Sequence, residues 1–306
     1  MKPIKKAVFP VAGMGTRFLP ATKASPKEML PVVDKPLIQY AAEEAVAAGI
    51  DTLVFVYGRT KNAIVDHFDK AYELERELQE RNKTKMLELV RNIVPPHVDC
   101  VFIRQAEALG LGHAVLCAKP VINDEPFAVI LADDLINFSS KPVLSQMVDT
   151  YNFQHSSVLG VERVPEDEVS SYGVVSGDQL KGNLIEVSGI VEKPPVAEAP
   201  SNLAVVGRYI LSPRIFQLLE NTPRGAGGEI QLTDAIASLL NEQRVLAYEF
   251  EGKRFDCGNK LGYLQAQVEF GLDHPEFGEE FEQYLNQLDT SKIRTGHSQS
   301  EIKTGT

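Results

Sequence analysis

Short apolar runs alternate with segments of helical pattern along the first half of the chain. The apolar runs have the length of buried strands and lie at residues 7–11, 53–57, 98–103, 127–131 and 157–161. Helical patterns run over residues 36–49, 61–92, 113–119 and 143–153. Strands that alternate with helices at this spacing are typical of β-α-β units. The sequence therefore predicts an α/β fold with a Rossmann-like, mostly parallel sheet flanked by helices.

The pattern changes near Tyr172, where four glycines between residues 173 and 189 interrupt short β-type runs. Such punctuation predicts a small antiparallel β insertion, over about residues 172–210, that folds over the edge of the sheet. A strand at 204–211, a helix at 230–240, a strand at 244–250 and a helix at 261–270 are expected as well.

We expect residues 1–272 to form one domain and residues 273–306 to form a C-terminal extension. The extension is polar, and no aromatic residue follows Tyr284, so we expect it to be flexible from about residue 290. The charged helical pattern at 61–92 is typical of a solvated excursion or of a contact between subunits.

Composition excludes several classes of protein. A net charge of -11 disfavours a nucleic-acid binder, because the phosphate backbone attracts basic surfaces. Apolar runs such as Ala128–Ala132 are too short to cross a membrane, and Pro10, Gly13 and Gly15 break the N-terminal stretch where a signal peptide would need an apolar run. The three cysteines are widely spaced, which indicates a reducing compartment, and we expect a cytoplasmic protein.

The charge is unevenly distributed. The first 35 residues hold seven Lys and Arg against two acidic residues, a net charge of +5, whereas the other 271 hold 24 basic and 40 acidic residues, a net charge of −16. The simplest explanation of this uneven charge distribution is chance together with the need for solubility. The sharper interpretation is an anion-binding site on a body that otherwise repels anions.

A glycine-rich loop, Gly13–Arg17, follows the first strand. Backbone amides in such a loop can approach phosphate oxygens closely. Phe18 stands where the dinucleotide fingerprint has its third glycine, and no Gly-Lys-Ser/Thr run is present. The loop instead carries Arg17, with Lys23 and Lys27 after it, and these cations suit a polyphosphate. A tight turn with surface cations explains the loop equally well.

Two carboxylates, Asp133 and Asp134, follow a buried strand, where open parallel sheets bind their ligands. Such oxygens suit Mg²⁺ beside phosphates, although an ordinary capped loop is a serious alternative. Asp256 also ends a strand, but its spacing from Asp133 does not show that the two meet. Glu192 and Lys193 precede two prolines, and in isolation a surface turn is the favoured interpretation of that segment.

The remaining histidines and cysteines form no catalytic pattern. Gly110–His113 is another glycine turn before a helix, suited to close approach of a planar ligand, and His113 alone is better explained as a residue at the start of that helix. The six histidines have no zinc-ligand spacing, and Cys257 is better explained as a packing residue than as a nucleophile.

Taken in order along the chain, these motifs resemble those of the sugar-phosphate nucleotidyltransferase family. The resemblance covers roughly residues 5–272. The segments that carry it are Ala12–Pro20, Ser25–Pro31, Asp34–Tyr40, Gly110–Ala114, Leu131–Asp134, Tyr172–Val175, Val191–Pro194, Val206–Tyr209, Gly228–Ala235 and Phe255–Gly258. Each segment is modest evidence, and their common order is highly specific. Ser25–Met29 and Phe255–Cys257 favour the branch that transfers a uridylyl group from UTP to glucose 1-phosphate and releases pyrophosphate.

The resemblance implies a role for each matching position. In the family, Arg17, Lys27 and Lys193 would act on the phosphates as catalytic cations, and Asp133 and Asp256 would ligate Mg²⁺. The residues that would bind the nucleotide are Ala12, Gly13, Gly15, Thr16, Gln105 and Gly110. The residues that would surround the sugar are Asp134, Gly173, Glu192 and Val206.

The attacking sugar phosphate is already an anion, so the implied in-line displacement requires no general base. It requires neutralisation, which Mg²⁺ and the three cations would supply. Similar enzymes form dimers or tetramers, so a homo-oligomer is expected. Three alternatives stay open: a sister enzyme that uses dTTP or another sugar 1-phosphate, a non-catalytic regulatory relative, and a nicotinamide dehydrogenase. The intact Thr16 and Arg17 argue against the second, and Phe18 argues against the third.

Overall fold

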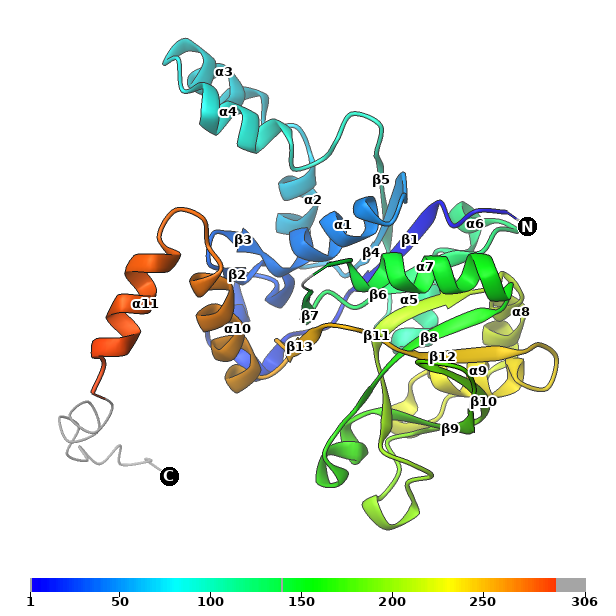
Figure 1. The fold of residues 1–306 in the computed structure, drawn as a ribbon. Helices are drawn as coiled ribbons and strands as arrows, with labels where there is room; N and C mark the ends of the chain where they lie inside the picture. Colours follow the sequence, from blue (N-terminus) through cyan, green and yellow to red (C-terminus); the bar gives the residue numbers. More distant parts are fainter. Residues whose placement is uncertain (1, 139, 290–306) are drawn as a thin grey trace, which may run out of the picture.

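The computed structural model describes residues 2–138 and 140–289. Within these residues, nine strands form one sheet in the order β5-β4-β1-β6-β11-β8-β12-β10-β9 (Figure 1). Its strands are β1 (Lys6–Val11), β4 (Thr52–Tyr57), β5 (Asp99–Arg104), β6 (Phe127–Ile130), β8 (Ser157–Arg163), β9 (Gly173–Gln179), β10 (Leu184–Glu192), β11 (Leu203–Leu211) and β12 (Val245–Glu249). Two small sheets pair β2 (Pro31–Val32) with β3 (Lys35–Pro36), and β7 (Asp134–Asn137) with β13 (Lys253–Asp256).

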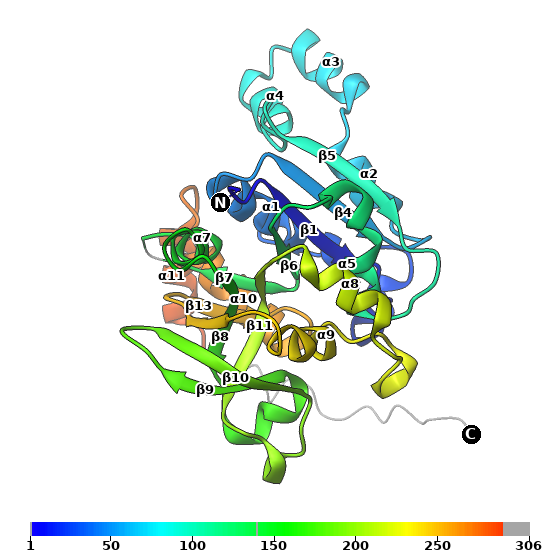
Figure 2. The ribbon, with the colours of Figure 1, turned by 90° about the vertical axis from the view of Figure 1, so that its right-hand side faces the viewer.

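Helices cover both faces of the large sheet, as the turned view shows (Figure 2). The α-helices are α1 (Leu37–Ala47), α2 (Asn62–Phe68), α3 (Tyr72–Glu80), α4 (Thr84–Arg91), α5 (Leu111–Cys117), α6 (Lys119–Ile122), α7 (Val143–Gln154), α8 (Arg214–Asn221), α9 (Leu232–Leu239), α10 (Lys260–Leu272) and α11 (Gly278–Gln287). The 3-10 helices are η1 (Thr16–Phe18), η2 (Ala21–Lys23), η3 (Lys27–Met29), η4 (Glu166–Ser171), η5 (Val196–Glu198) and η6 (Ala226–Gly228). One core cluster packs α1 and α7 on one face, and a second packs α5, α8 and α9 on the other.

The α/β class, the flanking helices and the predicted strands of the first half are confirmed. Strands β5, β4, β1 and β6 run parallel to one another. The interior positions of β4, β1 and β6 are largely apolar and buried, as expected for strands with helices on both faces, whereas the edge strand β5 is half-buried. The carboxyl ends of these parallel strands therefore lie along one edge of the sheet.

The expectation of a mostly parallel sheet is wrong, because the sheet is mixed. Strand β11 runs antiparallel between β6 and β8, and β12 returns parallel to β8. All nine residues of β11 are buried, which is typical of a central strand. Which neighbours such a strand joins depends on long-range pairing that local periodicity does not report.

The expected antiparallel segment at 172–210 exists, but only part of it lies at the edge of the sheet. Strands β9 and β10 form an antiparallel hairpin there, with Glu192 opposite Gly173. Strand β9 also pairs with the start of β11, so β11, β8, β12, β10 and β9 close on themselves. The last third of the segment is thus a strand of the central sheet.

The charged stretch at 61–92 is three helices, of which α3 and α4 project from the body (Figure 1). Helices α8 and α11 were not expected from the pattern; α8 buries Ile215, Phe216 and Leu219 against the sheet. The predicted flexibility from about residue 290 falls on residues outside those described. No described helix is both long enough and apolar enough to span a membrane.

A buried ion pair ties the two halves of the fold together. Arg208 of β11 is 1% exposed and donates three hydrogen bonds to Glu44 of α1, including one of 2.7 Å from Nη2 to Oε2. Its guanidinium also donates to the carbonyl oxygens of Leu131 and Asp134, at 3.1 and 3.0 Å. Arg208 therefore holds both ends of the turn that contains Asp133.

We predict that Arg208→Met lowers the free energy of unfolding by about 3–5 kcal/mol, because it leaves a buried carboxylate without its partner. Urea unfolding measures this. Arg76→Met is the control, because Arg76 pairs with Glu80 on an exposed helix surface, where an ion pair is worth about 0.5 kcal/mol or less. Equal effects of the two substitutions would contradict the prediction.

Candidate active site

The carboxyl ends of the parallel strands bring the predicted nucleotide-binding residues together. Gln105, directly after β5, donates its backbone N–H to the carbonyl oxygen of Tyr57 at 2.9 Å. Gly58, directly after β4, packs so closely that a Cβ there would lie 3.3 Å from the carbonyl oxygen of Ala12. Ala12, which follows β1, thus lies one strand away from Gly58 and two from Gln105.

The glycine-rich loop folds around the side chain of Lys27. Gly15 has a φ of 66°, which favours glycine, and its carbonyl oxygen accepts a 2.6 Å hydrogen bond from Thr22 Oγ1. A Cβ on Gly15 would lie 3.2 Å from Lys27 Cβ, and one on Gly13 would lie 4.0 Å from Lys27 Cε. The loop therefore runs along the length of the Lys27 side chain.

The side chain of Lys27 extends from this loop to Asp133 and forms an ion pair with it. Lys27 Nζ lies 2.5 Å from Asp133 Oδ2. Burial acts to lower the pKa of Lys27, but the carboxylates of Asp133 and Glu28 outweigh it and hold the pKa above its ordinary value. Burial likewise acts to raise the pKa of Asp133, and Lys27 outweighs it and holds that pKa below its ordinary value. Both groups are therefore charged near neutral pH.

Arg17 and Asp256 meet Asp133 at Gly258. A Cβ on Gly258 would lie 2.8 Å from Asp256 Oδ1, 3.0 Å from Asp133 Oδ2 and 3.4 Å from Arg17 Nη1. Arg17 Nη1 also donates to the carbonyl oxygen of Gly258 at 3.4 Å. The structure thus brings together four predicted residues from three distant parts of the chain: Arg17, Lys27, Asp133 and Asp256.

The two carboxylates fit a magnesium ion that is shared with a substrate. The described residues contain no group of three or more His, Cys, Asp or Glu side chains that could enclose a metal. Mg²⁺ is commonly held by one or two carboxylates, with waters and substrate phosphates as its other ligands. Asp133 and Asp256 match that donor set.

Asp134 is already bound by the protein. It lies opposite Asp256 in the small sheet, is 8% exposed, and its Oδ1 lies 2.5 Å from Arg254 Nε. A Cβ on Gly207 would lie 2.3 Å from Asp134 Oδ2, so the backbone of β11 packs directly on the carboxylate. Asp134 thereby joins the strand that carries Asp256 to the turn that carries Asp133.

Sequence reasoning missed Arg254 and Arg208, which hold this carboxylate region in place. The Arg254 guanidinium lies 5.0 Å from the centre of the Tyr172 ring and within 3.5 Å of the Tyr172 hydroxyl and of Glu162. The sequence contained one signal for it: two adjacent aspartates after a buried strand need a cation, and Arg254 precedes Asp256 by two residues, on the same strand face.

Lys61 is a second missed residue. Its ammonium lies 2.8 Å from Glu28 Oε2, and the two side chains are 4% and 3% exposed. Glu28 neighbours Lys27 in η3, so this buried ion pair fixes the segment that carries Lys27 to the start of α2.

The predicted sugar-site residues form a second group around the β9–β10 hairpin. Glu192 Oε2 accepts a 2.6 Å hydrogen bond from Thr233 Oγ1, and both oxygens lie within 3.3 Å of the place a Cβ would take on Gly173. Lys193 follows with a φ of 45°, and its side chain is 57% exposed, with Nζ 3.4 Å from Glu192 Oε1. The Val206 side chain is buried in the core, so only its backbone can face a ligand.

Cys257 is a packing residue, as the sequence indicates. It is 1% exposed, and burial, with the carboxylates of Asp134 and Asp133, raises the pKa of its thiol to about 12. A protonated, enclosed thiol is a poor nucleophile.

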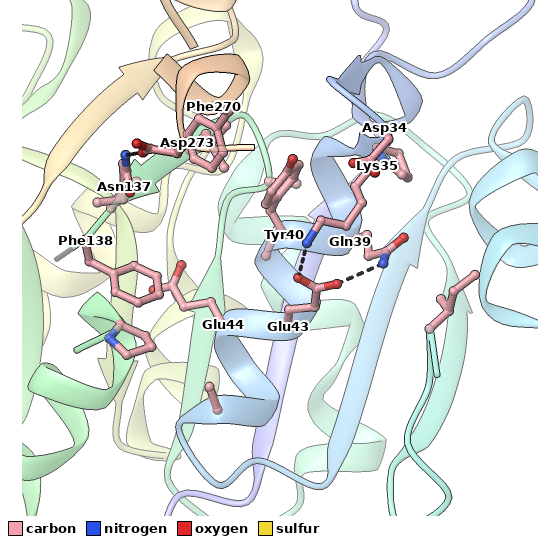
Figure 3. Close-up of a pocket in the computed structure, with 18 of the residues that line it drawn as sticks. Asp34, Lys35, Gln39, Tyr40, Glu43, Glu44, Asn137, Phe138, Phe270 and Asp273 are labelled. Atoms are coloured by element: carbon pink, nitrogen blue, oxygen red, sulfur yellow. Dashed lines mark hydrogen bonds and ion pairs between the residues drawn. The ribbon is translucent and has the colours of Figure 1, made fainter. Parts of the chain in front are cut away.

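A large pocket of about 960 Å³ lies apart from this cluster, between α1, β7 and the end of α10 (Figure 3). Tyr40, Phe138 and Phe270 line it, together with the ion pair of Lys35 with Glu43. Asp134 is the one predicted site residue in its lining, and its carboxylate is bound to Arg254. The Lys and Arg side chains in its lining, Lys35 and Arg208, are already paired with Glu43 and Glu44, so we do not place the reaction there.

Comparisons with known proteins identify the family of the chain. The family model described as nucleotidyl transferase matches residues 6–271. The chain is 51% identical over 288 residues to a UTP–glucose-1-phosphate uridylyltransferase of Bacillus subtilis, covering 94% of this chain and 98% of that protein. A UTP-bound UGPase of Acinetobacter baumannii superposes with a TM-score of 0.88 at 50% identity, covering 94% of this chain and 100% of that one. A UDP-glucose pyrophosphorylase complexed with UDP-glucose gives a TM-score of 0.82 at 47% identity, with coverage of 89% and 100%.

Proposed function

The chain belongs to the nucleotidyl transferase family, and we propose that it transfers the uridylyl group of UTP to glucose 1-phosphate, giving UDP-glucose and pyrophosphate. One observation carries the proposal: the cations Arg17 and Lys27 converge with the carboxylates Asp133 and Asp256 at the carboxyl edge of the sheet. We infer the substrates from a relative that is named for this reaction and from similar structures that are bound to UTP or UDP-glucose.

The chemical problem that this cluster addresses is repulsion between anions. A sugar phosphate must approach the α-phosphate of a triphosphate, and two unit charges about 4 Å apart repel by roughly 4 kcal/mol at an effective dielectric constant near 20. Arg17 and Lys27 neutralise the nucleotide phosphates, and the exposed Lys193 receives the sugar phosphate. The attacking oxygen is already ionised, so no residue has to act as a general base.

Asp133 and Asp256 would hold Mg²⁺ in this site. When bound, the ion supplies a positive charge that neutralises phosphate oxygens. The residues of the chain keep the two carboxylates in place for it: Arg208 through the turn before Asp134, and Arg254 through Asp134 itself.

The nucleotide and sugar groups occupy different elements. The loop of Gly13, Gly15 and Thr16 surrounds the phosphates. The residues that contact the base are Ala12, Gly13, Gln105 and Gly110. The β9–β10 hairpin covers the sugar, which Gly173, Glu192, Val206 and Asp134 surround. We place the catalytic domain at residues 1–272, with residues 273–306 as an extension, and the protein in the cytoplasm. The family match at residues 6–271 supports that boundary.

The direct test of the proposed function is pyrophosphate release with glucose 1-phosphate and, in turn, UTP, dTTP, CTP and ATP. We expect UTP to give the highest kcat/KM. A higher value with dTTP would identify a sister enzyme, and no product with any sugar 1-phosphate would identify a regulatory relative; either result contradicts the proposal.

We predict that Arg17→Ala, Asp133→Asn and Lys193→Ala each lower kcat by about 10²–10³, the usual cost of removing one group that stabilises developing charge. Circular dichroism should show an intact fold. Lys23→Ala is the matched control, because Lys23 is an exposed cation of the same N-terminal segment, and it should leave kcat unchanged. Near-normal turnover in all three variants would refute the site.

Asp256→Asn tests the metal site separately. The amide keeps the size of the carboxylate but is a poor ligand for Mg²⁺, so the Mg²⁺ concentration for half-maximal activity should rise at least tenfold. Kinetic titration with MgCl₂ measures it. An unchanged requirement for Mg²⁺ would remove Asp256 from the ligand set.

We also propose that the protein is a homo-oligomer, a dimer or tetramer, and that α10 contributes to the interface. Leu261, Leu264, Val268 and Leu272 recur at helical spacing on α10 and are 66%, 60%, 39% and 37% exposed. Such an apolar stripe is unfavourable in water unless another surface covers it.

Light scattering after gel filtration tests the interface. Leu264→Glu should shift the protein to a smaller species, because a buried contact would receive an unpaired charge. Leu89→Glu is the control, since Leu89 is an exposed leucine of α4 on the projecting helices, and it should leave the mass unchanged. A wild-type monomer would contradict the proposal.

A further inference from the structure

The side-chain amide of Gln105 is fixed by two acceptors of the protein. Its nitrogen, Nε2, lies 2.9 Å from His113 Nδ1 and 3.3 Å from the carbonyl oxygen of Gly110. A carbonyl oxygen only accepts hydrogen bonds, so the nitrogen of the amide must face Gly110. His113 Nδ1 then accepts the other N–H, which places the proton of the neutral imidazole ring on Nε2.

Both amide hydrogens are therefore used, and the oxygen of Gln105 faces away from these partners. Gln105 is only 6% exposed, and Oε1 is the one polar atom of its amide that neither His113 nor the Gly110 carbonyl binds. Towards the base site, Gln105 thus presents an acceptor.

The turn that holds both acceptors is rigid. Gly110 has a φ of 95°, and a Cβ there would lie 2.6 Å from Glu229 Cβ, so the backbone packs directly on the Glu229–Ile230 segment. Gly112 donates its N–H to the carbonyl oxygen of Ile230 at 2.9 Å. His113, in the first turn of α5, is thereby held at a fixed distance from Gln105.

A fixed amide discriminates between pyrimidine bases, whereas a free one does not. Uracil and thymine carry a hydrogen on N3, and cytosine carries a lone pair there. A freely rotating glutamine would turn over and donate to cytosine as readily as it accepts from uracil. Here the turned amide would set its oxygen against the Gly110 carbonyl and lose that hydrogen bond. It would keep the bond to His113 only if the imidazole moved its proton from Nε2 to Nδ1.

We propose that His113 is a positioning residue that, with the Gly110 carbonyl, locks the Gln105 amide so that the site accepts nucleotides with an N3–H and rejects cytidine nucleotides. The proposal rests on the proposed function in one respect, that Gln105 contacts the base. It gives His113 a role that its place at the start of a helix does not require.

Equilibrium binding of UTP, dTTP and CTP, measured by isothermal titration calorimetry, tests this role. His113→Phe and His113→Leu both remove the acceptor and differ in volume, so one can replace the other if folding fails; thermal melting checks each variant. Both should lower the preference for UTP over CTP by about fivefold, the effect of one hydrogen bond. The ratio of UTP to dTTP affinity should stay constant, because the two bases share the same edge.

Two further variants separate positioning from packing. His113→Asn keeps an acceptor near Nδ1 and should retain most of the preference for UTP over CTP. His67→Phe is the matched control: His67 is another half-buried histidine bonded to a glutamine, with Nε2 3.0 Å from Gln39 Oε1, and it lines the pocket of Figure 3, outside the base site. It should leave every ratio unchanged.

Equal affinity of the wild type for UTP and CTP, or a wild-type preference in both His113→Phe and His113→Leu, would overturn the inference. Because base preference is measured by binding, a failure of uridylyl transfer in the turnover assay would overturn the proposed function alone.

Discussion

The ion pair between Lys27 and Asp133 is the interaction on which the candidate site depends. It joins the glycine-rich loop near the N-terminus to the turn after β6, over 106 residues of sequence, with an Nζ–Oδ2 distance of 2.5 Å. The pair keeps both groups charged, because each offsets the cost of burying the other. Lys27, a cation that can bind phosphate, and Asp133, a carboxylate that can bind a metal, therefore lie side by side.

Other buried charges keep this pair in register. The Lys61–Glu28 pair fixes the segment that carries Lys27. Arg208 fixes the turn around Asp133, and Arg254 fixes Asp134 opposite Asp256. Buried ion pairs are weak evidence for stability, because removing charges from water costs nearly as much as their attraction returns. Here the buried pairs instead hold Lys27 and Asp133 in position, and these two groups must stay partly exposed in order to bind a substrate and a metal.

The local pattern of apolar and polar residues was sufficient to predict individual strands and helices, but not how the strands pair. Runs such as 53–57 and 127–131 could be identified as strands because a short, continuous apolar run is visible in the local sequence. The antiparallel course of β11 between β6 and β8 escaped prediction, because it depends on pairing between distant segments. The family resemblance, which rested on ordered motifs, is confirmed by the comparisons.

The same distinction separates the predicted site residues from the missed ones. Arg17, Asp133 and Asp256 meet at Gly258, and Lys27 is paired with Asp133, so residues that the family resemblance grouped lie together. Arg254, Arg208 and Lys61 went unnoticed, because their task is to neutralise carboxylates whose burial exists only in the folded chain. Asp134 was assigned to the sugar, and its carboxylate has a protein partner that sequence could not reveal.

The carboxylates gathered beside Arg17 and Lys27 are expected to receive the metal that accompanies the nucleotide. A crystal structure with Mn²⁺ and UTP tests it most directly, since Mn²⁺ replaces Mg²⁺ and is located by its anomalous scattering. We predict an anomalous peak in coordination distance of both Asp133 and Asp256, with the triphosphate against the glycine-rich loop. A peak that contacts neither carboxylate would contradict the account.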